Sequence, residues 1–313
     1  MDISRRGFLA GLLAIGLAGC APAPDPRMSV TPTTWARPPI WPQAATNEAS
    51  VATLYLSAAS VVDGAADWAN AAAAMHAAHA ATMNQPDPWG GFTQGTPTPG
   101  AAPADTVAAI STLKTALADA TDTATQGLAQ AVAGPEALLW ASLLVCCAVG
   151  ADWCADPAAA RPPVIAGSVV PYSITLGPPA TAAADALDRC FALSFALTTA
   201  LGRTGKGSAL HADLAARLAQ ANTLQTSLKG IISAAGTTPP PPQLSYPLPS
   251  GLGDEAAIRA TWGALEAALG TSCAYLAGCQ GGADGSTTAT TAGDCWASAT
   301  AMGQQLTWWP GWR

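Results

Sequence analysis

The stretch IRATWGALEAALGTSCAYLAG, residues 258–278, contains the pattern that determines the fold class. Its large apolar side chains recur at intervals of three, four and seven residues, at Ile258, Trp262, Leu265, Leu269 and Leu276. This spacing places them on one face of an α-helix. A helix with one apolar face must bury that face against other elements, so the stretch predicts one helix of a multi-helix bundle.

Similar patterns occur along most of the chain. We predict Ala-rich helices over residues 46–83, 105–134, 135–156, 179–203, 206–236, 253–279 and 291–306. Thr46 and Asp105 are suitable N-caps, Pro135 suits a first helical position, and Gly64 is a weak point in the first helix. The one β-like run, VIAGSVVPYSITLG (164–177), is bounded by proline pairs and is predicted to be loop. The predicted fold class is therefore all-α.

The chain is predicted to have five parts. They are a signal peptide (1–19), a lipidated proline-rich linker (20–44), an N-terminal helical region (45–156), a second linker (157–178) and a C-terminal helical bundle (179–313). The first linker has the proline content of a semi-rigid spacer. The N-terminal helices are expected to pack on or beside the bundle.

The first residues have the composition of an export signal. In SRRGFLAGLLAIGLAGC (4–20), two arginines precede an apolar run about half as long as the roughly 20 residues that cross a bilayer. The segment resembles a twin-arginine signal that ends in a lipobox, with Cys20 as the lipidated residue. Two acyl chains at Cys20 would provide stable attachment, so we expect an exported protein anchored to the extracytoplasmic face of the cell membrane. The alternative is an ordinary secretory signal with an unrelated cysteine.

Charge and hydropathy narrow the class of protein. A net charge of -7 and a sequence pI of about 4.7 argue against nucleic acid or anionic lipid as partners. Hydrophobic residues reach 50% and the mean hydropathy is +0.26, mostly because of alanine. The longest apolar stretch after the signal, ALLWASLLVCCAV (137–149), is shorter than a membrane span. The part after the signal is therefore expected to fold outside the bilayer.

Four segments, in order, resemble a known family. They are AADALDRCFALSFALTTALG (183–202), HADLAARLAQANTLQTSLKGIISAAGTTPPPP (211–242), LSYPLPSGLGDEAAIRATWGALEAALGTSCAYL (244–276) and CWASATAMGQQLTWWPGW (295–312). Over about residues 181–312 the chain resembles a ferritin-like domain family of uncharacterised bacterial lipoproteins. The most specific parts of the match are the SYPLP segment, Glu266 and the closing Trp-Pro-Gly. The resemblance implies a ferritin-like four-helix bundle and supplies no known activity.

Most ligands of a ferritin-like di-metal site are missing from the sequence. Such a site takes a Glu from each of two helices and a Glu-x-x-His from each of the other two. This chain contains no Glu-x-x-His, and Cys190 and Phe191 stand where relatives tend to carry Glu-His. Glu266 keeps a family-like position, but one carboxylate cannot hold two irons. We therefore expect no enzyme activity, no cofactor and a degenerate metal site.

A separate candidate metal site lies upstream, in MHAAHAATM (75–83). His76, His79 and Met83 fall on one helical face at positions i, i+3 and i+7. Imidazole with thioether is a ligand set that suits copper, which an exported protein meets directly. The alternative is a histidine pair between helices beside two core methionines.

The eight cysteines include Cys20, which leaves an odd number for pairing. Cys279 is predicted at the end of one helix and Cys295 about one turn into the next, across the glycine-rich segment GGADGSTTATTAGD (281–294). Antiparallel helices joined by a short connection bring such positions together, so we predict a Cys279–Cys295 disulfide. The alternative is that Cys279 pairs with another cysteine.

The sequence favours a non-enzymatic envelope lipoprotein, in which the helical bundle binds or assembles with an envelope protein. One alternative is an exported copper-type metal-binding protein that uses His76, His79 and Met or Cys ligands. Another is a carrier of a small apolar ligand held between helices. Trp308, Trp309 and Trp312 are expected either to cap the bundle or to present an apolar edge to a partner or to the lipid surface. Hydrolase and phosphate-loop motifs are missing from the sequence.

Overall fold

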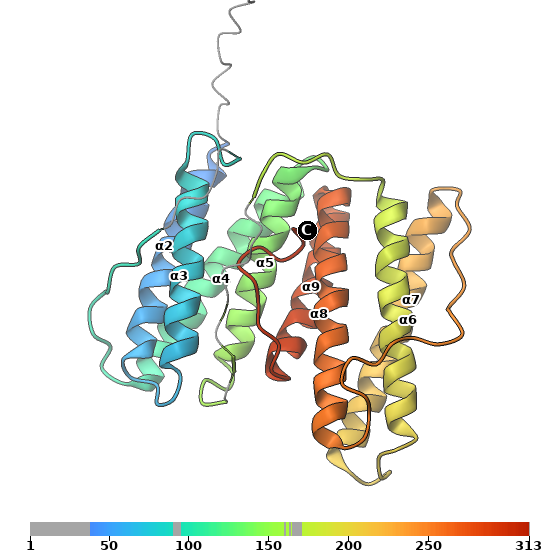
Figure 1. Cartoon of the computed structure of the whole chain (residues 1–313). Coiled ribbons are helices and arrows are strands. Elements are labelled where there is room, and N and C mark those ends of the chain that lie inside the picture. The colour runs from blue at the N-terminus through green and yellow to red at the C-terminus, as the bar shows by residue number, and fades with distance from the viewer. Residues whose placement is uncertain (1–37, 90–94, 160, 163, 165–170, 313) are drawn as a thin grey trace, which may run out of the picture. The chain divides into compact units, whose positions relative to one another are not determined.

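The computed structural model describes residues 38–89, 95–159, 161–162, 164 and 171–312, and residues 37–313 form one compact unit. All regular secondary structure in these described residues is helical (Figure 1). The helices are α2 (Ile40–Ala59), α3 (Ala66–Asn84), α4 (Thr106–Gln130), α5 (Pro135–Trp153), α6 (Pro179–Leu201), α7 (Ala209–Ala234), α8 (Glu255–Gln280) and α9 (Gly282–Ala301). The predicted all-α fold class is confirmed.

The helices form two sets of four, α2–α5 and α6–α9. In each set the first helix packs on the second and the third, and the third packs on the fourth. A long connection joins the second helix to the third in both sets, after α3 and after α7. The two sets therefore have the same order of packing, and residues 154–178 connect them.

Helix α5 joins the two sets, because it packs on α4 in its own set and on α8 and α9 in the other. Side chains from both sets contribute to one hydrophobic core. By length and composition, α5 is the one described helix that is long and apolar enough to cross a bilayer, and 78% of its most apolar window is buried inside the protein. Its apolar residues therefore serve the core.

Several helix starts agree with the caps that the sequence offers. The side chains of Asp105, Ser208 and Asp254 accept hydrogen bonds from the backbone amides at the first turns of α4, α7 and α8. Pro135 and Pro179 open α5 and α6, where a missing amide hydrogen costs nothing. These local signals explain why the predicted ranges of the middle helices are close to the observed ones.

The predicted helix over residues 46–83 is two helices in the structure. The chain leaves α2 at Ala59, turns at Gly64 with a φ of +73°, and enters α3 at Ala66. Thr46 lies inside α2 and donates a hydrogen bond to the carbonyl of Pro42, so it is not the N-cap. Because α2 and α3 fold back on each other, side chains near the middle of each helix meet.

The last helix also differs from the prediction, since GGADGSTTATTAGD is mostly helical and not a loop. Gly281, with a φ of +61°, is the turn between α8 and α9. The structure does not form the predicted Cys279–Cys295 disulfide, and none of the seven described cysteines is in one. Cys279 lies in the last turn of α8, whereas Cys295 lies about 20 Å along α9 from its start, at 1.5 Å per residue.

The segment after α9 returns to the first helix set. The carbonyl of Pro310 accepts a hydrogen bond from Ser142 of α5, and the C-terminal segment crosses α5 in Figure 1. Trp308, Trp309 and Trp312 are 6%, 3% and 6% exposed. These tryptophans are therefore packed inside the protein and do not form an exposed apolar edge.

Candidate functional site

Three ionisable side chains meet in the core of the first helix set. Glu48 lies on α2, and His76 and His79 lie on successive turns of α3. The Nδ1 atoms of His76 and His79 lie 2.6 and 3.0 Å from Oε2 of Glu48. Both histidine side chains are 0% exposed and that of Glu48 is 2% exposed. One oxygen and two imidazole nitrogens within 4.8 Å of one another are a possible metal ligand set.

The hydrogen bonds assign protons to this cluster. Nε2 of His79 lies 2.8 Å from the carbonyl oxygen of Trp308, which only accepts, so Nε2 is the donor. Nδ1 of the same ring lies 3.0 Å from the Glu48 carboxylate. His76 donates through Nδ1, and its Nε2 is buried without a hydrogen-bond partner. The polar contacts of the cluster are thus complete except at one imidazole nitrogen.

Burial and the histidines act on the pKa of Glu48 in opposite directions. Burial raises the pKa of this carboxyl, but its charge and hydrogen-bond interactions with His76 and His79 outweigh burial and lower the pKa to about 2. Burial also lowers the pKa of His76 from its usual value, although Glu48 favours the protonated ring. At neutral pH the cluster therefore contains an ionised Glu48 and a neutral His76.

Aromatic rings and thiols surround the cluster. Tyr55 stacks on His76 with ring centroids 5.4 Å apart, and Trp309 lies 4.5 Å from the ring centre of His79. Sγ of Cys147, on α5, lies 3.9 Å from Oε1 of Glu48. Burial, and next the charge of Glu48, raise the pKa of the Cys147 thiol well above its usual value. The surroundings are apolar, and the nearest further metal donor is a protonated thiol.

The structure brings His76 and His79 together, and Glu48 supplies a third ligand atom. Met83 is fully buried in the hydrophobic core. Sequence reasoning missed Glu48, although a signal was present. Glu48 shares a helical face with Ala44, Ala45, Val51, Ala52 and Tyr55, and a lone carboxylate on an apolar face needs a buried partner.

The second helix set holds another buried carboxylate, Glu266 of α8, which is 0% exposed. Arg217 of α7 donates to both of its oxygens through Nε and Nη2, the second at 2.7 Å. The indole nitrogen of Trp262 donates to Oε1 at 2.8 Å. Burial opposes the charge of Arg217, but its hydrogen bonds to Glu266 raise the guanidinium pKa above its usual value.

These residues do not fit the di-metal centre that the family resemblance implies. A guanidinium has no lone pair for a metal, and it already binds both oxygens of Glu266. Cys190 donates its thiol hydrogen to the carbonyl of Ala221 at 3.3 Å, and burial raises its pKa to about 12. Glu266 is therefore a hydrogen-bonded partner of Arg217, and neither of its oxygens is open to iron in this arrangement.

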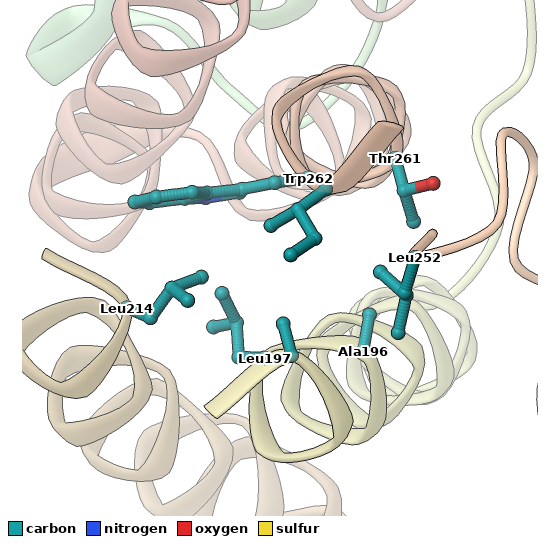
Figure 2. Close-up of a pocket in the computed structure, with 8 residues that line it drawn as sticks. Ala196, Leu197, Leu214, Leu252, Thr261 and Trp262 are labelled. Atoms are coloured by element: carbon teal, nitrogen blue, oxygen red, sulfur yellow. The ribbon is translucent and has the colours of Figure 1, made fainter. Parts of the chain in front are cut away.

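A narrow apolar pocket lies next to this ion pair. Figure 2 shows Leu197 of α6, Leu214 of α7 and Trp262 of α8 around it, with Leu252 at one side. The space between these side chains does not admit a water molecule. This pocket therefore gives no support to a carrier of small apolar ligands.

Comparisons with protein-family models, curated proteins and solved structures found no match for this chain. The resemblance to ferritin-like lipoproteins therefore stays a prediction. Cys20, the predicted lipidation site, lies outside the described residues. The same holds for the predicted signal peptide.

Proposed function

We propose that this protein is a lipid-anchored, extracytoplasmic helical protein that acts as a non-enzymatic binding or assembly module. The observation that supports the non-enzymatic part is the Arg217–Glu266 ion pair. Two of its hydrogen bonds occupy both oxygens of the one carboxylate that keeps a family-like position. A buried ion pair with satisfied hydrogen bonds is a structural feature, and it leaves neither oxygen of Glu266 free to bind iron.

The helix order supports the proposed ferritin-like relationship of the second set. Ferritin-like four-helix bundles contain one long connection, and α6–α9 contain theirs between α7 and α8. The first set, α2–α5, has the same order. We infer that the chain contains two bundles of one topology, of which the second has lost its metal ligands.

The membrane anchor in this proposal comes from the lipobox at Cys20 and the proline-rich linker that follows it. A lipid at Cys20 would tether the helical unit at the extracytoplasmic face of the membrane. The net charge of -7 disfavours nucleic acid, so an envelope protein is the expected partner.

Ferrous iron tests the non-enzymatic part of the proposal. The purified chain after residue 20, mixed with ferrous iron in air, is expected to oxidise it no faster than buffer does. Oxygen uptake and the absorbance of ferric iron measure the rate. Catalytic oxidation, with many irons turned over per chain, would overturn the proposal.

Fractionation of cells tests the anchor. Cys20→Ala removes the only cysteine in the lipobox, so the variant is expected in the soluble exported fraction while the unaltered chain stays with membranes. Cys154→Ala, at the end of α5, is the control for loss of a thiol elsewhere. A Cys20→Ala protein that remains on membranes after a high-salt wash contradicts the lipid anchor.

A further inference from the structure

We propose that Glu48, His76 and His79 bind one divalent transition-metal ion in the first helix set, and that the ion is zinc. This site goes beyond the proposed function, which assigns no metal to the protein. It also differs from the copper site expected from the sequence, because a carboxylate replaces the thioether of Met83.

The ligand atoms converge in the way that coordination requires. Nδ1 of His76 and Nδ1 of His79 both point to the same oxygen, Oε2 of Glu48, at 2.6 and 3.0 Å. The other oxygen, Oε1, has the Cys147 thiol as its contact at 3.9 Å. These two nitrogens and one oxygen lie within 4.8 Å of one another, which makes them a candidate set of metal ligands.

The distances need little change to accept an ion. In a tetrahedral site with bonds of about 2.1 Å, neighbouring ligand atoms lie about 3.4 Å apart. The two N–O distances in the cluster are 2.6 and 3.0 Å, so each must widen by less than about 1 Å. The side chains come from two helices of one hairpin, and a small rotamer change at Glu48 is sufficient.

The surrounding contacts are those of a ligand shell. A metal-binding histidine usually donates its other ring N–H to a carbonyl or carboxylate, which fixes the ring. His79 does so, with Nε2 donating to the carbonyl of Trp308 at 2.8 Å. His76 has no such hydrogen bond, since its Nε2 is buried without a partner, and the stacked ring of Tyr55 is its contact instead.

Two imidazoles and one carboxylate are ligands of zinc and equally of iron(II). The thiol of Cys147 beside them favours zinc, which accepts nitrogen, oxygen and sulfur ligands in one tetrahedral site. Two neutral imidazoles and one carboxylate leave one positive charge on a divalent ion, which is costly in an apolar core. Cys147 is the nearest group that could neutralise it, because a bound metal deprotonates a coordinating thiol. We propose Cys147 as the fourth ligand, which requires its side chain to move towards the ion, because Sγ is not among the atoms that lie within 4.8 Å of one another.

The test uses the chain after residue 20, produced with zinc in the medium and analysed for metals by mass spectrometry. About one zinc per chain is expected, and His76→Ala/His79→Ala should reduce it at least tenfold. His211→Ala is the matched control, because His211 is the one histidine outside the cluster and hydrogen-bonds to Thr204. This control should keep its zinc.

A second measurement does not depend on the variants being folded. X-ray absorption at the zinc edge of the unaltered protein should show two imidazoles, one oxygen and one sulfur at about 2.3 Å. A shell with nitrogen and oxygen alone would remove Cys147 from the site. Copper in place of zinc would overturn the assignment of the ion. If the unaltered protein contains no transition metal and takes none up when refolded with zinc, the cluster is a structural ion pair and the proposal is wrong.

Discussion

Glu48 and Glu266 are both buried carboxylates in the interior of four-helix sets, but their partners make them chemically different. Glu48 is held by two imidazoles, which can exchange a proton for a metal ion. Glu266 is held by the guanidinium of Arg217, which is always charged and only donates. The comparison teaches that burial of a carboxylate alone says nothing about metal binding. Whether such a carboxylate can share a metal ion depends on whether the neighbouring side chains can lose a proton and offer a lone pair.

The geometry of the two clusters follows the same division. Arg217 donates parallel hydrogen bonds to both oxygens of Glu266, so each oxygen of that carboxylate has a donor. Both histidines address one oxygen of Glu48, and the second oxygen has a weak thiol contact. The oxygens of Glu266 therefore have no room for a further partner, while Oε1 of Glu48 can still bind one.

The largest effect is expected when the Arg217–Glu266 pair is broken. Arg217→Met leaves an uncompensated buried charge and should lower the free energy of unfolding by about 3–5 kcal/mol. Denaturant unfolding measures the change. Arg259→Met is the control, because Arg259 and Glu255 form an exposed pair and should lose less than about 1 kcal/mol. Arg217→Met combined with Glu266→Met should recover most of the loss, and a double variant as unstable as Arg217→Met contradicts this account.

The second expected effect is on acid stability. The folded pKa of Glu48, about 2, lies below the ordinary value of 4.5, so its contribution is present above pH 4.5 and is lost as the pH falls towards 2. The shift corresponds to a contribution on the order of 3 kcal/mol. In the metal-free protein, the stability difference between the unaltered chain and Glu48→Gln should shrink across this range. A difference that stays constant from pH 7 to pH 2 contradicts the prediction, and the exposed Glu255→Gln serves as control.

A slightly smaller effect is expected from zinc itself. A ligand at one hundred times its dissociation constant stabilises the folded state by about 2.7 kcal/mol, which raises the melting temperature by a few degrees. Calorimetry should show this rise for the unaltered chain and for Arg217→Met. It should be missing in His76→Ala/His79→Ala. A rise that persists without the histidines would place the zinc elsewhere.

The smallest expected effect concerns the two adjacent thiols of α5. Cys147→Ser should weaken zinc binding about tenfold, which equals about 1.4 kcal/mol. Cys146→Ser is the matched control, because the thiol of Cys146 donates to the carbonyl of Trp308, whereas the thiol of Cys147 donates to Glu48. Competition with a coloured zinc chelator measures both. Equal weakening by the two substitutions would show that Cys147 has no special role.

Local signals in the sequence were sufficient to predict the boundaries of the helices in the middle of the chain, and insufficient for the first and last helices. Caps and prolines located α4 to α8 because they act within one turn. The start of α9 was missed because Gly and Thr disfavour helix. There, close packing outweighs propensity, since a Cβ on Gly293 would lie 2.7 Å from the Cβ of Ala148.

The candidate site was partly predictable for the same reason. His76 and His79 are three residues apart on one helix, so their spacing reveals their common face. Glu48 is 28 residues from His76, and the pair forms only because the chain turns back at Gly64. Arg217 and Glu266 are 49 residues apart. Pairings of this kind depend on tertiary packing, which the pattern of a single helix does not contain.

The hydrogen bond between His79 and the carbonyl of Trp308 joins residues 229 positions apart. Contacts this distant close late in folding, because the entropy of a long loop must be lost first. The α2–α3 hairpin, with Glu48 and both imidazoles, is translated far ahead of Trp308 and forms from neighbouring residues. The carbonyl of Trp308 is therefore expected to join the cluster after Glu48 and the two imidazoles have met.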